Sequence, residues 1–101
     1  MAYKIIYKKR YLNSLDKLIL YLEKTWPVSV AHNFMDILAN CLNLLKVNSN
    51  MGLETSIKNT RTILITKHNR LYYCIEKNKI IILNMINTRR NPISNPFKKP
   101  A

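Results

Sequence analysis

Three apolar runs separated by two short polar breaks make up residues 61–90, and they constrain the fold of this chain more than any other feature. The runs are rich in Ile, Thr, Tyr and Leu, and the breaks fall at residues 68–69 and 77–78. Runs of this kind joined by tight polar turns are typical of an antiparallel β-meander. The last run, residues 80–86, is almost entirely apolar, which predicts a strand in the middle of a sheet with both faces buried.

Two stripes of apolar residues at helical spacing precede the meander. Between residues 12 and 26, apolar side chains recur every three or four positions, which predicts an amphipathic helix that Asn13 or Ser14 could cap and Pro27 ends. A second stripe runs from about residue 28 to 47. The link between the stripes is so short that the two helices are predicted to form an antiparallel hairpin.

The remaining segments complete an α+β fold with the order β-α-α-β-β-β. Residues 3–8 predict a short first strand, and residues 53–60 predict a polar connection. The expected architecture is an antiparallel four-stranded sheet with the N-terminal two-helix hairpin packed on one face. Along residues 61–67 the odd-numbered and even-numbered side chains alternate between the faces. The face without helices is expected to be open and to display cations.

The domain organisation is simple, because residues 1–92 predict a single domain and residues 93–101 a proline-rich basic tail. At 101 residues, of which 48% are apolar, the chain is long enough for one hydrophobic core. No apolar run reaches the roughly 18 residues of a membrane-spanning helix, and the start MAYKIIYKKRYL lacks the apolar core of a secretory signal. Cys41 and Cys74 match no disulfide or metal-site spacing. We therefore expect a reduced cytoplasmic protein with no membrane segment, metal or cofactor.

The net charge of the chain is strongly positive and unevenly distributed. Seventeen Lys and Arg against five Asp and Glu give a formal charge of +12. Residues 1–54 carry seven basic and four acidic side chains, a net of +3, whereas residues 55–101 carry ten and one, a net of +9. Such an excess opposes compaction by self-repulsion unless a partner neutralises it. The second half therefore predicts a polyanion or an acidic protein as partner.

Three segments in this order, YLNSLDKLILYLEKTWP, ILITKHNRLYYCIE and KIIILNMINTRRNP, resemble the RelE/ParE superfamily, the toxins of bacterial type II toxin–antitoxin modules. The resemblance extends from Tyr3 to about Pro92, and it implies a compact sheet with a helical hairpin. It also implies a cognate antitoxin whose C-terminal segment wraps the toxin. The charge of the chain agrees with an acidic, amphipathic antitoxin segment that folds on binding.

The RelE branch of the superfamily consists of metal-independent, ribosome-dependent ribonucleases, which help a 2′-hydroxyl to attack the neighbouring phosphate of mRNA. That chemistry needs cations to stabilise the charge that develops on phosphate, and a group that takes the 2′-proton. By resemblance, the cationic positions fall on Arg70, on Arg61, and on Arg89 or Arg90. Further nucleic-acid-binding candidates in the same half are Lys67, Tyr72, Lys77 and Lys79.

The chain departs from the ribonuclease pattern at two positions. The family has a second basic residue on the first strand of the meander, but this chain has Ile63 at that position. Many active members also have a Tyr or His near the C-terminus, and the matching Pro96-Phe97 region contains neither residue. A substitute base would have to be His68, Tyr72 or Tyr73, although a turn or core role is the more ordinary one for each.

These departures leave three hypotheses. The first is a toxin that cleaves mRNA on the ribosome, and the clustered Arg and Lys favour it by a small margin. The second is a toxin like those of the ParE branch, which bind and inhibit DNA gyrase without enzymatic activity. The third is a basic RNA-binding module without toxicity.

Overall fold

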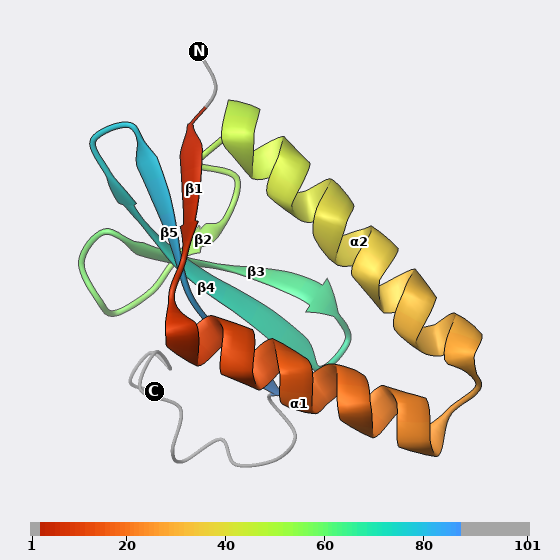
Figure 1. Ribbon diagram of the computed structural model, residues 1–101. Coiled ribbons are helices and arrows are strands. Elements are labelled where there is room, and N and C mark those ends of the chain that lie inside the picture. The colour runs from red at the N-terminus through yellow and green to blue at the C-terminus, as the bar shows by residue number, and fades with distance from the viewer. Residues whose placement is uncertain (1–2, 88–101) are drawn as a thin grey trace.

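The computed structural model describes residues 3–87, and Figure 1 shows their arrangement. The elements in chain order are β1 (Lys4–Tyr7), α1 (Lys9–Thr25), α2 (Val28–Val47), β2 (Leu53–Glu54), β3 (Thr60–Thr66), β4 (Asn69–Glu76) and β5 (Lys79–Asn87). The meander is thus confirmed, with turns at residues 67–68 and 77–78. No helix in this part of the chain is long and apolar enough to cross a membrane.

Within residues 3–87 the sheet has five strands in the order β1-β5-β4-β3-β2, so the prediction of a four-stranded antiparallel sheet was wrong in detail. β1 pairs with β5 in parallel, while the other pairs are antiparallel. β2 lies inside the segment expected to be a polar connection, and its two residues are too few to show an alternating pattern. β5 has neighbours on both sides, as its apolar sequence predicts.

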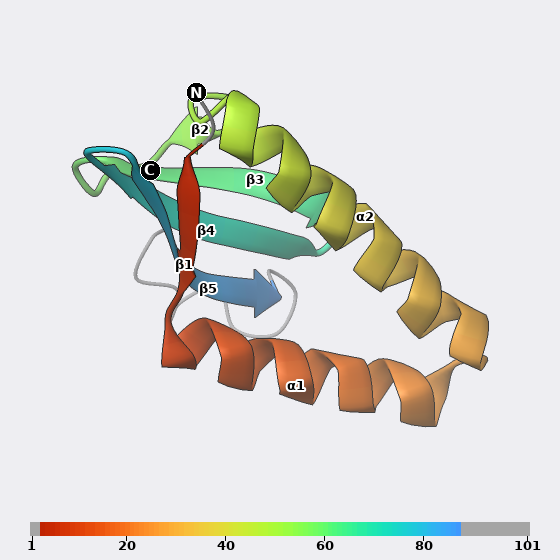
Figure 2. The same ribbon diagram turned by 45° about the horizontal axis from the view of Figure 1, so that its top comes forward.

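Both helices pack on the same side of the sheet, and they diverge from their junction at Pro27 (Figures 1 and 2). α2 has the predicted bounds, but α1 begins at Lys9 instead of residue 12. Lys8 is its N-cap and makes no side-chain capping hydrogen bond, so neither Asn13 nor Ser14 caps the helix. Lys9 and Arg10 occupy the first turn of α1, where their aliphatic stems are compatible with a helix.

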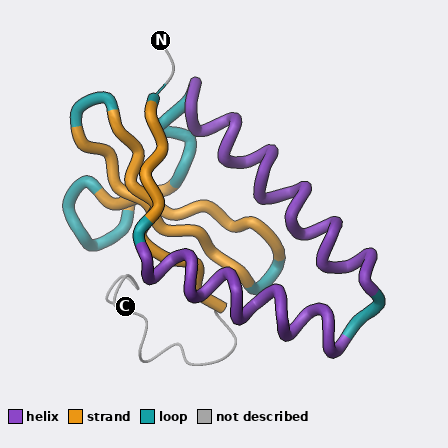
Figure 3. Tube along the Cα trace, in the orientation of Figure 1, coloured by secondary structure: helices purple, strands orange, loops and turns teal. Residues whose placement is uncertain are grey.

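The hydrophobic core lies between the helices and the sheet. Its buried members are Tyr11, Phe34, Leu38, Cys41, Leu45, Ile65, Leu71, Tyr73, Ile80, Ile82 and Met85. We call the sheet face that carries Leu71 and Tyr73 the inner face, and the opposite face, which carries Arg70 and Tyr72, the outer face. The tube in Figure 3 shows both helices on the inner side of the strands.

Bulges interrupt two strand pairs and redirect the side chains that follow. Tyr72 pairs with Asn84 but Tyr73 pairs with Ile82, so Leu83 is the extra residue in β5. The Asn84 side chain then contacts α1, where its Oδ1 accepts hydrogen bonds from Ser14 Oγ at 2.7 Å and from the Met85 amide at 2.8 Å. A second irregularity lies between Leu64 and Thr66 of β3.

Candidate functional site

Arg70, the first of the predicted site residues, lies on the outer face near the start of β4. It pairs in register with Leu64 of β3 and Ile86 of β5. The side chain is half-buried, and its Nη1 donates a long hydrogen bond of 3.5 Å to Thr62 Oγ1. The guanidinium therefore retains donors for an anion, because a guanidinium carries five N–H groups.

Arg61 lies on the inner face, opposite Tyr73 in the β3–β4 register. Its Nη1 donates to the carbonyl oxygens of Gly52 at 2.7 Å and Asn50 at 3.4 Å, and its Nη2 lies 3.6 Å from Glu54 Oε1. Ile63 and Ile65 of the same strand belong to the core side, and a residue two positions before Ile63 must share their face. The structure therefore does not bring Arg61 and Arg70 together.

The predicted lysines divide between the two ends of the sheet. Lys67 lies in the β3–β4 turn, near Arg70, whereas Lys77 and Lys79 lie at the β4–β5 turn. The eight residues of β4 separate the two turns by about 25 Å at ~3.3 Å per residue. Arg89 and Arg90 lie outside the described residues.

None of the three candidate bases has a fully exposed side chain. Tyr72 and Tyr73 point to opposite faces as predicted, yet both are buried, at 3% and 0% exposure. The Tyr73 hydroxyl accepts from the Gly52 amide at 3.0 Å and donates to the Ser49 carbonyl oxygen at 2.8 Å. Burial raises the pKa of Tyr73, with the Gly52 hydrogen bond and Arg61 acting in the opposite direction. His68 is a half-buried residue of the β3–β4 turn.

Gly52, with Tyr73 and Arg61, locks the loop between α2 and β2. A Cβ on Gly52 would lie 2.6 Å from Tyr73 Oη and 3.0 Å from the Thr62 carbonyl oxygen, so no larger residue fits without a shift. The signal that could have revealed the lock is Gly52 itself, the single glycine of the chain.

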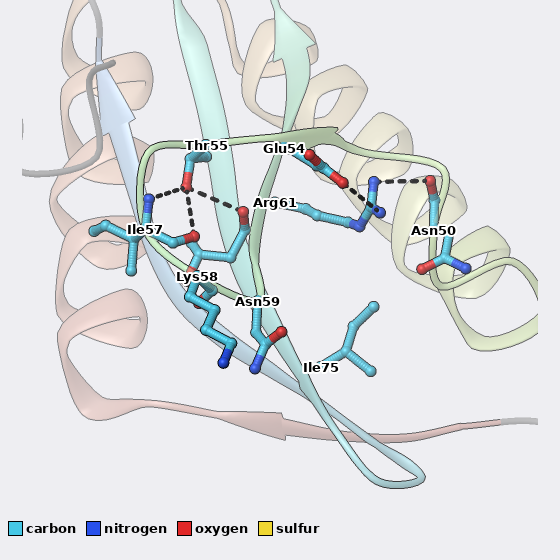
Figure 4. A pocket seen from close by; sticks show the side chains of 9 residues that line it. Asn50, Glu54, Thr55, Ile57, Lys58, Asn59, Arg61 and Ile75 are labelled. Atoms are coloured by element: carbon cyan, nitrogen blue, oxygen red, sulfur yellow. Dashed lines mark hydrogen bonds and ion pairs between the residues drawn. The ribbon is translucent and has the colours of Figure 1, made fainter. Parts of the chain in front are cut away.

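A pocket of about 480 Å³ opens beside this lock (Figure 4). Its walls are the α2–β2 loop, the β2–β3 loop and adjoining strand residues, and its lining is Asn50, Glu54, Thr55, Ile57, Lys58, Asn59, Thr60, Arg61 and Ile75. Thr55 Oγ1 organises the β2–β3 loop, accepting from the Ile57 amide at 3.1 Å and donating to the Thr60 carbonyl oxygen at 3.0 Å. The lining holds two cations, one carboxylate that pairs with Arg61, and two side-chain amides, but no nucleophile with an adjacent base, so it suits a binding role.

Large apolar side chains are exposed along the diverging helices. Trp26 is 53% exposed, Val28 62%, Leu20 58% and Leu44 55%. Exposed apolar side chains that form a contiguous patch are typical of surfaces that bind a protein partner. Across residues 3–87, no group of three His, Cys, Asp or Glu side chains is placed to hold a metal ion.

Comparisons with known proteins agree with this architecture. A family model described as the ParE toxin of type II toxin–antitoxin system, parDE, matches residues 5–92. No curated protein matches the sequence significantly.

Solved structures share the fold at low sequence identity. A chain of the chromosomal ParDE toxin–antitoxin system from P. aeruginosa superposes with a TM-score of 0.72 at 12% identity, covering 85% of this chain and 96% of that one. The free-state mutant of the E. coli toxin RelE gives 0.63 at 15% identity, with 96% and 95% covered. A chain of the E. coli DinJ–YafQ toxin–antitoxin complex gives 0.62 at 15% identity, with 88% and 96% covered.

Proposed function

Because the chain belongs to the ParE toxin family of type II toxin–antitoxin systems, we propose that it is the toxin of such a module and that it inhibits growth by binding DNA gyrase. The choice of gyrase follows the resemblance to the ParE branch. The alternative within the superfamily is ribosome-dependent cleavage of mRNA.

The observation that carries this proposal is the separation of Arg61 from Arg70. Cleavage of RNA by this class of enzyme needs several cations that converge on one phosphate, together with a proton acceptor. Arg61 instead donates to the carbonyl oxygens of the α2–β2 loop on the inner face. Tyr73 is likewise committed to that loop. The described residues therefore supply Arg70 as a single cation of the expected set, which suits binding better than catalysis.

One arrangement favours the second candidate, mRNA cleavage. Lys67 and Arg70 lie at the end of the sheet where β5 ends at Asn87, and Arg89 and Arg90 follow directly in the sequence. In this candidate Arg70 would stabilise the charge on the phosphate, and Arg89 or Arg90 would complete the site.

The antitoxin in either case would cover the exposed apolar side chains of α1 and α2. These helices hold three of the chain's five acidic residues, and the rest of the chain is strongly basic. An amphipathic partner with acidic residues on its polar face would bury the apolar surface and neutralise the neighbouring charge. The apolar run IIILNMI in β5 gives a further reason for the antitoxin to bind the toxin soon after synthesis, since such a strand aggregates when it is exposed.

Two assays with the purified full chain test the proposed target. We expect the protein to block supercoiling by gyrase and to leave mRNA intact in a reconstituted translation system mapped by primer extension. Arg70→Ala is the test variant. Lys17→Ala on α1, which removes the same amount of charge, is its matched control. Ribosome-dependent cuts that disappear in Arg70→Ala and persist in Lys17→Ala, with normal supercoiling, would establish the second candidate in place of the first.

A further inference from the structure

The parallel pairing of β1 with β5 gathers lysines from opposite ends of the sequence. Lys4 of β1 is the register partner of Lys79 of β5. The Lys4 amide donates to the Asn78 carbonyl oxygen at 3.1 Å, which places the turn containing Lys77 beside it. Lys8 follows β1, and its amide donates to the Ile82 carbonyl oxygen at 3.0 Å. We call Lys4, Lys8, Lys77 and Lys79 the lysine edge.

Three of these lysines point to the outer face. Tyr3 and Ile5 pack against the core, so Lys4 and Lys8, which alternate with them, are on the opposite side. Lys79 precedes the core residue Ile80 and shares that side. The proximity of Lys8 to β4 is consistent with its effect on Cys74, whose pKa is raised by burial and by Glu76 and lowered by Lys8.

The lysine edge is exposed, and its lysines are not paired with carboxylates in the described part of the chain. All four side chains are exposed, and across residues 3–87 none of them forms an ion pair with a carboxylate. Glu76, the register partner of Lys79, is the one acid on this part of the outer face in the described chain. Cations held this close repel one another, so a polyanion that neutralises them gains free energy.

We propose that the lysine edge binds the phosphate backbone of double-stranded DNA. The choice of DNA over RNA rests on the proposed gyrase target, because gyrase acts on duplex DNA. The other steps rest on the surface itself.

The composition of the surface favours phosphate over an acidic protein. The lysine edge contains lysine and no arginine, and lysine is depleted from the desolvated centres of protein–protein interfaces, whereas arginine is enriched. Lysine nevertheless binds phosphate well as a mobile point charge. Lys4 and Lys8 are about 13 Å apart along β1, a length over which one DNA strand presents about four phosphates at ~3.4 Å each.

The outer face also favours a duplex over a single strand. Proteins that bind single strands stack the bases on exposed aromatic rings. Tyr72, the aromatic side chain that β4 presents on this face, is 3% exposed and so offers no stacking surface. A backbone contact without base readout would be independent of DNA sequence.

Fluorescence anisotropy with a labelled 25-base-pair duplex tests the proposal with the full chain and without gyrase. The test variant carries Lys4→Gln, Lys8→Gln and Lys79→Gln, and the control carries Lys17→Gln, Lys24→Gln and Lys46→Gln, three exposed lysines of the helices. We expect the test variant to lose at least tenfold in affinity at 50 mM salt, and its slope of log K against log salt to fall by about 0.9 per lost contact. The control should lose markedly less.

Several outcomes would overturn the proposal. Equal losses in the two triple variants would mean that net charge alone drives binding. Tighter binding of a single strand, an RNA duplex or polyglutamate than of the DNA duplex would assign the surface to another partner. Thermal unfolding of both variants checks that each is folded. Because gyrase is absent, a chain that binds DNA through the lysine edge but leaves supercoiling unaffected would contradict the gyrase target alone.

Discussion

The Tyr73 hydroxyl lies 3.0 Å from the Gly52 amide nitrogen, so a residue in the middle of β4 holds the loop that leaves α2. The same hydroxyl donates to the Ser49 carbonyl oxygen, and Arg61 binds the Gly52 carbonyl oxygen. A short loop thus has its polar main-chain groups satisfied by two side chains of the sheet. This arrangement sets the position of the C-terminal end of α2 relative to the strands.

Gly52→Ala is expected to destabilise the fold by about 1–3 kcal/mol, because the new methyl group would overlap the Tyr73 ring and hydroxyl. Urea denaturation measures the change. Tyr73→Phe in the same chain removes the hydroxyl oxygen at 2.6 Å, but it leaves the ring carbon Cε1 at 2.9 Å and the Thr62 carbonyl oxygen at 3.0 Å. The double variant should therefore be less destabilised than the sum of the losses in unfolding free energy of the two single variants. Strict additivity would show that the contact is not the cause.

Arg61→Ala is expected to lower stability by about 1–2 kcal/mol, since it leaves the buried end of the α2–β2 loop with unpaired carbonyl oxygens. Glu54→Gln removes the ion pair with Arg61, but the Glu54 side chain is 78% exposed, so its effect should stay below about 0.5 kcal/mol. Chemical denaturation compares the two. An Arg61→Ala protein with unchanged stability and lost toxicity would instead favour a direct functional role for this arginine.

Stability is expected to fall above pH 10 because of Tyr11. This side chain is 2% exposed, and burial, with smaller effects from Tyr7 and Cys41, raises its pKa from 10.0 to about 12. Since the folded state binds this proton more tightly than the unfolded state, its contribution is complete below pH 10 and is lost between pH 10 and 12. The loss amounts to about 2–3 kcal/mol.

Thermal unfolding between pH 8 and 12 measures the effect, and Tyr11→Phe is the control. The variant keeps the ring that stacks on Tyr7 but has no titrating hydroxyl. Its stability should decline less steeply over this range. Parallel curves for the two proteins would contradict the assignment to Tyr11.

Asn84→Ala should cost about 1–2 kcal/mol, because it leaves the Ser14 hydroxyl and the Met85 amide without their acceptor. Ser14→Ala measures how much of this loss in stability comes from the hydrogen bond between Asn84 and α1. A double-mutant cycle should give a coupling of about 0.5–1 kcal/mol between the two residues. A coupling near zero would mean that the bulge holds α1 by packing alone.

The local patterns of the sequence predict most of the elements but not all of their pairings. The stripe of α2 and the alternation of the meander are short-range signals, and both are confirmed. The parallel partner of β1 is far away in the chain, and nothing in its four residues specifies that partner. β2 is shorter still, so no periodicity could reveal it.

The candidate site was less predictable, because a residue type does not specify a face. Arg61 was assigned a role from its position in a family pattern, although its alternation with Ile63 and Ile65 already placed it with apolar neighbours. Ile63 and Ile65 bury one side of β3 against the core. Arg61 lies on that same side, and its guanidinium therefore donates to the Gly52 carbonyl oxygen of the α2–β2 loop. Lys4 was overlooked because its neighbour Lys79 is adjacent only through the parallel pairing.

The pairing of the first strand with the last also has a consequence for synthesis on the ribosome. β1 leaves the exit tunnel early, yet it cannot join the sheet until β5 has emerged. Until then α1, which packs mainly on β5, lacks the strand that covers its apolar side chains, and such long-range closure is slow to fold. A truncated chain that lacks β5 should therefore have neither a stable core nor a lysine edge, so premature termination would yield a harmless and easily degraded fragment.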